Sequence, residues 1–119
     1  MKLINIATEV SKRTDSIYVN ATPDNPRPNN DAWHKARTVA HHEIIAETGC
    51  EIEPGTVSKI EYDTKVDRYT VTFLDSSRTF KMRATNEVAQ FIFTNINGAG
   101  YWRVKMENGI VIDAVKFTL

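Results

Sequence analysis

The C-terminal stretch YWRVKMENGIVIDAVKFTL, at positions 101–119, predicts a β-hairpin. Its centre, Asn108-Gly109, is a pair that two-residue type I′ turns prefer, because both turn positions need a positive φ. The flanking runs are rich in aromatic and β-branched residues, which are enriched in strands. Counting outward from the turn gives the expected cross-strand pairs Met106 with Val111, Val104 with Asp113, and Trp102 with Val115.

One carboxylate, that of Asp113, is expected on the apolar face of this hairpin. The other residues of that face are Trp102, Val104, Met106, Val111, Val115 and Phe117. A charge among apolar side chains is costly unless it is paired or hydrogen-bonded. Two interpretations stay open: Asp113 accepts hydrogen bonds from a ligand, or it pairs with an internal arginine or lies near the open end of the sheet.

The rest of the chain predicts a single α+β domain over residues 1–119. Apolar spacing and turn signals predict a short N-terminal helix, strands at 16–21, 56–62, 68–74 and 78–83, and helices at 31–47 and 86–97. We therefore expect an antiparallel sheet of about five to six strands with two main helices and the short N-terminal one. The second main helix is apolar on nearly every side, which favours a contact with a partner subunit over complete burial in so small a domain.

A stiff polar segment, PDNPRPNND at 23–31, precedes the first main helix. Each proline holds the residue before it out of helical geometry. The backbone that carries Arg27 is therefore stiff, and Asn30 adds an amide group to the same segment. Preorganised groups lose little entropy on binding, so the segment suits the wall of a polar pocket. An extended connector, whose asparagines satisfy its own backbone, explains it equally well.

The amino-acid composition limits the kinds of partner that the protein can bind. Fifteen Lys and Arg balance fifteen Asp and Glu, so no cationic surplus supports binding to long nucleic acids. A chain without net charge is poorly protected from self-association, which favours a homo-oligomer. The single cysteine cannot form an intrachain disulfide, and no apolar run is long enough to cross a membrane. We expect a cytoplasmic protein with no membrane partner.

The sequence shows no catalytic or metal-binding signature. His34 and His41 lie seven residues apart on the first main helix, with His42 adjacent, whereas zinc-binding pairs on helices usually lie four apart. We interpret these histidines as solvated. Cys50 lies in a linker without a nucleophile signature, and no Gly-rich phosphate loop occurs. We expect no enzyme activity, no metal and no cofactor.

Two segments, YVNATPDNPRPNNDAWHKAR and NEVAQFIFTNINGAGYWRVK, carry a resemblance to a known family. In these segments the chain resembles the first Thoeris anti-defence family, phage counter-defence proteins that act as sponges. Such proteins bind cyclic ADP-ribose-type immune signals, and some bind cyclic oligonucleotides, without cleaving them. The resemblance implies a homo-oligomer in the host cytoplasm with ligand pockets at subunit contacts.

The function we expect is non-catalytic sequestration of a nucleotide-like immune signal. Rings would stack on the base, guanidinium groups would meet phosphate, and amides and a carboxylate would read polar edges or ribose hydroxyls. The expected ligand-binding residues are Arg27, Asn30, Phe80, Asn95, Trp102, Arg103 and Asp113. The aromatic residues among them could instead belong to the core. Two other functions stay open: a protein–protein inhibitor of a host enzyme and a small nucleotide hydrolase.

Overall fold

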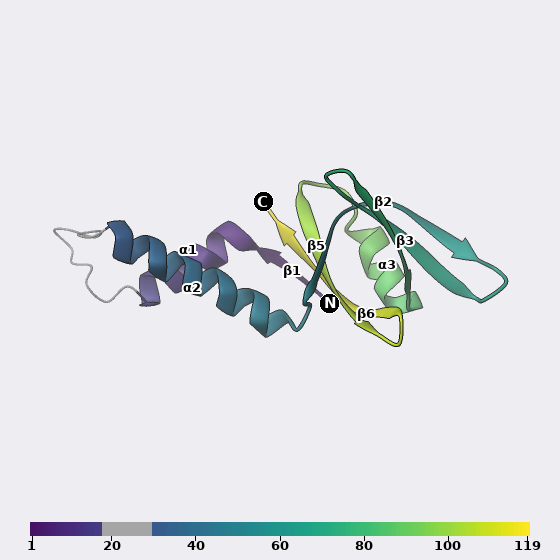
Figure 1. Cartoon of the computed structure of the whole chain (residues 1–119), viewed down its shortest axis with the longest axis horizontal. Coiled ribbons are helices and arrows are strands. Elements are labelled where there is room, and N and C mark those ends of the chain that lie inside the picture. Colours follow the sequence, from purple (N-terminus) through teal and green to yellow (C-terminus); the bar gives the residue numbers. More distant parts are fainter. Residues whose placement is uncertain (18–29) are drawn as a thin grey trace.

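The computed structural model describes residues 1–17 and 30–119, which form helices and one mixed sheet (Figure 1). In chain order the elements are β1 (Lys2–Asn5), α1 (Ile6–Ile17), α2 (Asn30–Thr48), β2 (Ile52–Asp63), β3 (Arg68–Asp75), β4 (Arg78–Ala84), α3 (Asn86–Thr94), β5 (Gly100–Glu107) and β6 (Ile110–Thr118). The α+β class expected from the sequence is confirmed.

Five of the strands close into a barrel. The pairing runs β6-β4-β3-β2-β5 and returns to β6, while β1 pairs with β6 from outside the ring. With α3 between β4 and β5, this is the connectivity of an OB-type barrel. The expected antiparallel sheet is wrong at two pairs, because β1–β6 and β4–β6 are parallel. Parallel neighbours need a long crossover, and the one between β4 and β6 consists of α3 and β5.

The barrel interior and α3 share one hydrophobic core. Its buried residues are Val71, Phe73, Ala84, Val88, Ala89, Ile92, Trp102, Val104, Val111 and Ala114. The hydroxyl of Thr85 accepts a hydrogen bond from the Val88 backbone nitrogen at 3.3 Å and so caps the N-terminus of α3. The helix ends at Thr94, three residues before its predicted end, and Phe93 stays 70% exposed.

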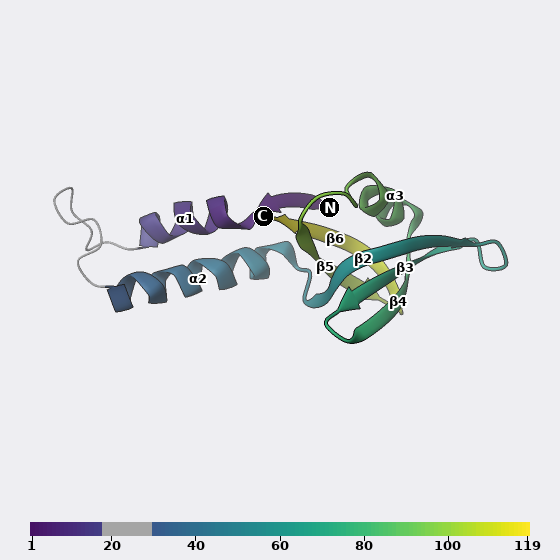
Figure 2. The same ribbon diagram turned by 90° about the horizontal axis from the view of Figure 1, so that it is seen from above.

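A second core lies on the opposite face of β5 and β6, where the helices meet the barrel. It contains Ile6, Val10, Ala40, Ile44, Cys50, Val115 and Phe117. Strand β6 thus contributes one face to each core, because successive side chains of a strand point to opposite sides. From this junction α1 and α2 project away from the barrel side by side, which makes the molecule elongated (Figures 1 and 2).

The predicted C-terminal hairpin is confirmed, but its register is wrong beyond the turn. Met106 pairs with Val111 as expected, yet Lys105 pairs with Asp113, so Ile112 is an extra residue on β6. Such a bulge shifts the pairing by one residue and moves every later side chain to the other face. Asp113 therefore does not lie among the apolar side chains of the barrel interior, where the regular register would place it. Beyond the bulge, the pairs are Val104 with Ala114 and Trp102 with Lys116.

The N-terminal elements also differ from the prediction. Leu3 lies in β1, and the helix begins only at Ile6. Ser16 and Ile17, expected to open a strand, instead end α1, and the remainder of that predicted strand lies outside the described residues. The predicted strands at 68–74 and 78–83 are confirmed as β3 and β4, which form an antiparallel hairpin that pairs Val71 with Met82 and Phe73 with Phe80. None of the helices in the described part of the chain is both long and apolar enough to cross a membrane.

Candidate functional site

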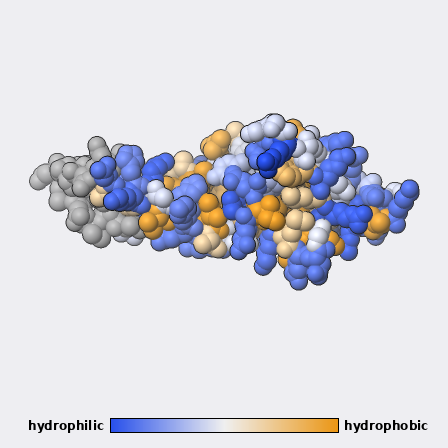
Figure 3. Space-filling view, viewed as in Figure 1, coloured by the Kyte–Doolittle hydropathy of each residue, from blue (hydrophilic) through white to orange (hydrophobic). Residues whose placement is uncertain are grey.

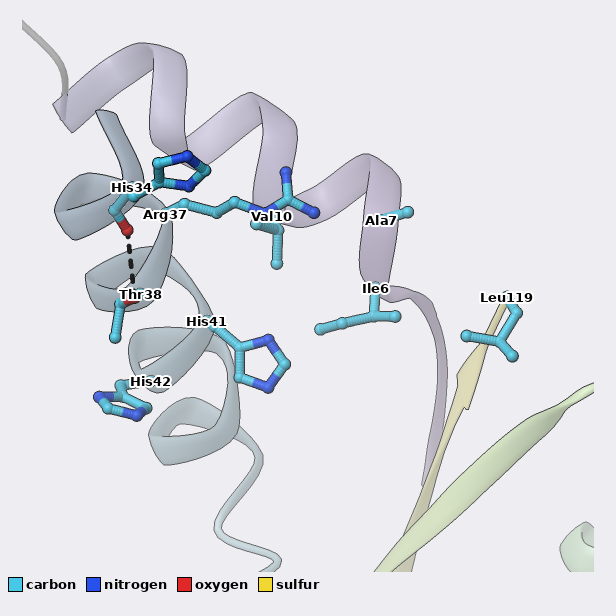
Figure 4. A pocket seen from close by; sticks show the side chains of 9 residues that line it. All are labelled: Ile6, Ala7, Val10, His34, Arg37, Thr38, His41, His42 and Leu119. Atoms are coloured by element: carbon cyan, nitrogen blue, oxygen red, sulfur yellow. Dashed lines mark hydrogen bonds between the residues drawn. The ribbon is translucent and has the colours of Figure 1, made fainter. Parts of the chain in front are cut away.

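A pocket of about 510 Å³ lies between α1 and α2 (Figure 4). Its volume falls in the range of small-molecule sites, roughly 300–1,000 Å³. The lining residues are Ile6, Ala7 and Val10 from α1, His34, Arg37, Thr38, His41 and His42 from α2, and Leu119. Three imidazoles and a guanidinium therefore face a mainly apolar wall.

Helical periodicity explains why these side chains gather. His34, Arg37 and His41 follow one another at intervals of three and four residues, which brings them to one side of α2 on successive turns. Figure 4 shows Arg37 and His41 extending from α2 toward α1. The opposite wall is held in place because the Asn5 side chain accepts a hydrogen bond from the Thr8 backbone nitrogen at 3.1 Å and caps α1.

The carboxylates that pair with Arg13 do not line the pocket. On the other side of the helix pair, the Arg13 guanidinium donates two hydrogen bonds to the Glu47 carboxylate, at 2.8 and 2.6 Å. It also bonds Glu9 at 3.3 Å and lies 4.0 Å from Glu43. The hydrogen bond from Arg13 lowers the pKa of Glu47. None of the residues that line the pocket carries a carboxylate side chain.

Aromatic contacts position Arg37 and His34, which line the α2 side of the pocket. The Arg37 guanidinium lies 5.5 Å from the centre of the Trp33 ring, within cation–π range. The Trp33 and His34 rings meet edge to face, with centroids 5.2 Å apart. The Thr38 hydroxyl donates to the His34 carbonyl at 3.1 Å, as the dashed line in Figure 4 shows. Arg37 is thus half-buried and held by a ring, which leaves its charge directed at the pocket rather than at a carboxylate.

Two of the residues expected to bind ligand meet at Lys116 instead. Trp102 is only 2% exposed and packs edge to face on Phe91, so the expectation that its ring stacks on a ligand is corrected to a core position. Asn95 ends α3, where its side-chain amide donates to the Phe91 carbonyl at 2.9 Å. The Lys116 ammonium lies 5.8 Å from the Trp102 ring and donates to the Asn95 carbonyl at 2.7 Å.

Arg103 lies on the opposite face of β5 from Trp102, because adjacent residues of a strand point to opposite sides. Its guanidinium donates to the carbonyls of Cys50 and Glu51 at 2.8 and 2.9 Å and reaches the Glu53 carboxylate at 3.4 Å. These contacts hold the start of β2 against β5 and use three of the five N–H donors of the guanidinium group. The expectation that Arg103 and Trp102 share one ligand is therefore corrected.

The remaining expected residues do not join that pair. Asp113 accepts hydrogen bonds from the Met1 nitrogen at 2.7 Å and the Ala114 backbone nitrogen at 2.9 Å. Phe80 pairs with Phe73 across β3 and β4 and packs against the barrel core. Arg27 and the side chain of Asn30 lie outside the described residues. The described side chains of the expected site are thus spread over several parts of the barrel.

The pocket between the helices was missed because its histidines were interpreted as solvated. Their spacing along one helix was visible in the sequence, but the wall supplied by α1 was not. Burial raises the pKa of the Cys50 thiol, which disfavours the thiolate that acts as a nucleophile. In residues 1–17 and 30–119, no three His, Cys, Asp or Glu side chains gather as metal ligands.

Comparisons with protein-family models, curated proteins and solved structures found no match to this chain.

Proposed function

We propose that the protein binds a small nucleotide-like anion in the pocket between α1 and α2 and holds it without cleavage. One observation carries the proposal: three imidazoles and a guanidinium line a cavity of about 510 Å³ in which no lining side chain is a carboxylate. An anion entering this cavity meets hydrogen-bond donors and a fixed positive charge, without a negative side chain in the lining to repel it.

The two walls suit the two halves of a nucleotide. Arg37 presents a planar fork of donors that matches phosphate oxygens, and a ring nitrogen of His41 can donate to the same group. Ile6, Val10 and Leu119 offer an apolar surface for a base or another flat ring. Charge on one side and apolar surface on the other would orient such a ligand across the pocket.

The resemblance to the first Thoeris anti-defence family supplies the ligand class and the biological role. Under this proposal the ligand is a cyclic ADP-ribose isomer or a cyclic oligonucleotide, and the protein is a phage counter-defence factor in the host cytoplasm. The pocket replaces the site first expected from Trp102 and Arg103, because those side chains are committed to the core and to β2. A homo-oligomer remains part of the proposal.

OB-folds bind oligonucleotides at one face of the barrel. In this protein that face supports binding of long nucleic acids less well than the pocket supports binding of a small anion. That face is the outside of the two strands corresponding to β3 and β4. On that side of the two strands lie Arg68, Thr70 and Leu74 of β3 and Thr79, Lys81 and Arg83 of β4, together with Thr72, which is buried. Single-stranded nucleic acids bind largely by stacking on aromatic rings, and these positions of the two strands supply none. A shared fold does not by itself assign a function.

A small nucleotide hydrolase is the second candidate, and the same pocket favours it. Imidazoles act as general acids and bases, and a guanidinium can stabilise charge on a phosphoryl group. His34, His41 and Arg37 line one cavity, so acid–base cleavage of a phosphodiester is chemically conceivable there. Sequestration and hydrolysis differ in what the protein releases after binding.

The test uses the full chain, cyclic ADP-ribose isomers and cyclic dinucleotides. We expect at least one of them to raise the melting temperature and to be recovered intact by mass spectrometry after the protein is heated. Arg37→Gln should weaken that binding at least tenfold, since a charge-assisted contact contributes roughly 1.5–3 kcal/mol.

Lys35→Gln is the matched control, because Lys35 is an exposed cation on α2 that does not line the pocket. It should bind like the wild type. Recovery of a cleaved ligand would replace sequestration by hydrolysis. Absence of binding by every nucleotide tested would contradict the proposal and would favour the protein–protein inhibitor.

A further inference from the structure

A second hollow, of about 450 Å³, lies at the far end of the molecule from the helix pair, between α3 and the projecting part of the β2–β3 hairpin. Its lining residues are Ile60, Tyr62, Tyr69, Ala89, Gln90, Phe93 and Thr94. The Tyr62 and Tyr69 rings lie 5.0 Å apart and tilted by 55°. No charged side chain lines this hollow, which distinguishes it from the pocket between α1 and α2.

Two of the rings in this hollow extend into solvent. Phe93 is 70% exposed and Tyr62 is 47% exposed. Figures 1 and 2 together place α3 behind the face shown in Figure 3, and that face carries mostly hydrophilic side chains with apolar ones scattered among them. Single exposed apolar residues are ordinary on protein surfaces, but several that adjoin a concave apolar site indicate an interaction surface. The rings are not needed to close the barrel, since α3 covers it with Val88, Ala89 and Ile92.

We propose that this surface binds a second copy of the chain about a two-fold axis, with Phe93 of each copy entering the hollow of the other. A two-fold interface requires one patch that is complementary to itself. This patch can satisfy the requirement because one of its lining residues, Phe93, is 70% exposed, while Tyr62, Tyr69 and Ile60 line the rest of the hollow. The aromatic lining gives an incoming phenyl ring edge-to-face partners.

Charge also favours a second copy as the occupant. The chain has a formal net charge of zero, so two copies do not repel each other through their overall charge. The uncharged lining means that no ion loses its hydration when the hollow is filled. A strongly charged partner would find no complementary groups in the hollow.

The size of the patch determines how strongly we expect the two copies to associate. Stable interfaces bury about 800 Å² on each partner and involve roughly 20–30 residues a side. A contact centred on the seven lining residues is smaller, so we expect a reversible dimer whose population depends on concentration. The interface lies at the opposite end of the molecule from the pocket between α1 and α2 (Figure 1), so dimer formation and ligand binding can be measured separately.

Sedimentation velocity of the full chain at about 5–500 µM tests the interface. We expect a monomer–dimer equilibrium in the wild type and a dissociation constant at least tenfold higher in Phe93→Glu. Leu74→Glu is the matched control, because Leu74 is 45% exposed on the outer side of the barrel and lies outside the hollow. It should dimerise like the wild type. A wild-type chain that stays monomeric throughout would leave the hollow to another protein and overturn the proposal, as would equal effects of the two variants.

A complementation experiment tests the ring-in-hollow arrangement itself. Phe93→Ala removes the ring but leaves the other six lining residues in place, whereas Gln90→Arg keeps the ring but places a charge in the hollow. Each variant alone should dimerise weakly. Mixed in equal amounts, they should form a heterodimer at least threefold tighter than either homodimer, because one ring still finds one open hollow. If the mixture associates no better than the separate variants, the ring-in-hollow arrangement is wrong.

Discussion

Two buried threonines differ in one hydrogen bond. The Thr14 hydroxyl on α1 donates to the Val10 carbonyl at 2.7 Å. The Thr72 side chain on β3 is only 3% exposed, and its oxygen has no hydrogen-bond partner among the described residues. A buried hydroxyl without a partner keeps the cost of losing its hydration, whereas a bonded one recovers much of that cost.

Replacing each threonine by valine should therefore change stability in opposite directions. Thr72→Val should raise the free energy of unfolding by about 1 kcal/mol, and Thr14→Val should lower it by about 1 kcal/mol. Urea unfolding of the two variants beside the wild type measures both changes, and each serves as the control for the other. Stabilisation by Thr14→Val, or loss of stability in Thr72→Val, would contradict the hydrogen-bond assignment.

The pKa of Glu47 should report whether α1 and α2 stay together. The hydrogen bond from Arg13 lowers this pKa, with the charge of Arg13 adding to the effect. Because the folded pKa lies below the unfolded one, the stabilisation is complete above the unfolded pKa and is lost as the pH falls through the folded pKa. The pair is exposed to solvent, so salt should weaken the shift.

Titration of the Glu47 carboxyl by NMR measures this pKa directly. In Arg13→Met the midpoint should move up toward that of an unpaired glutamate, whereas Arg37→Met, on the other side of the helix pair, should leave it in place. An unchanged midpoint in Arg13→Met would show that the two side chains do not pair in solution.

Strand β2 pairs with two neighbouring strands, and this arrangement depends on Gly55. It pairs with β3 and with β5, and its register shifts between Ile52 and Gly55 on one side and between Val57 and Lys59 on the other. Gly55 has a φ of +104°, and a Cβ atom there would lie 2.0 Å from the Leu74 carbonyl oxygen. Both the backbone conformation and the space therefore exclude a side chain at this position.

Gly55→Ala should lower the free energy of unfolding by more than about 3 kcal/mol, because the strand must move away from β3 or lose its curvature. Gly109→Ala is the control: Gly109 also has a positive φ, of +77°, but nothing lies within 4 Å of the added methyl group. That change should cost only about 1 kcal/mol. Urea unfolding compares the two, and similar losses would show that the close approach at Gly55 is unimportant.

The sequence predicts elements whose signals are local and misses those that depend on long-range pairing. Local signals predicted the strands at 68–74 and 78–83, which are β3 and β4 in the structure. The Asn108-Gly109 turn was also correct, but nothing near it marked Ile112 as an extra residue, so the faces of β6 beyond the bulge were reversed. The parallel pairs of β6 join segments far apart in the chain, and no local pattern encodes them.

The candidate site shows the same division. The interval between His34 and His41 gives their shared side of α2 from the sequence alone. The pocket exists because Ile6 and Val10 from another helix face them, and the intervening segment carries no signal for that arrangement. Trp102 and Arg103 showed the reverse error: adjacent aromatic and cationic residues looked like one binding set, yet the pleat of the strand sends them to opposite faces.

Strand β6 connects the two parts of the elongated molecule. The radius of gyration is 17.5 Å, against about 13.5 Å for a compact domain of this length. The helix pair projects from the barrel, but Val115 and Phe117 of β6 pack against it, whereas Val111 and Ala114 of the same strand pack inside the barrel. Unfolding either part would therefore expose one face of β6, which should couple the two parts.

One tryptophan reports on each part: Trp33 lies on α2, and Trp102 is buried in the barrel. In Trp102→Phe the remaining fluorescence follows the helix pair, and in Trp33→Phe it follows the barrel. We expect urea transitions by fluorescence and by far-UV circular dichroism to coincide within each variant, since a shared strand makes unfolding a single cooperative step. Trp102→Phe should lower the shared midpoint, because it removes buried volume. Earlier loss of Trp33 fluorescence than of ellipticity would mean that the helix pair unfolds independently and that β6 does not couple the two cores.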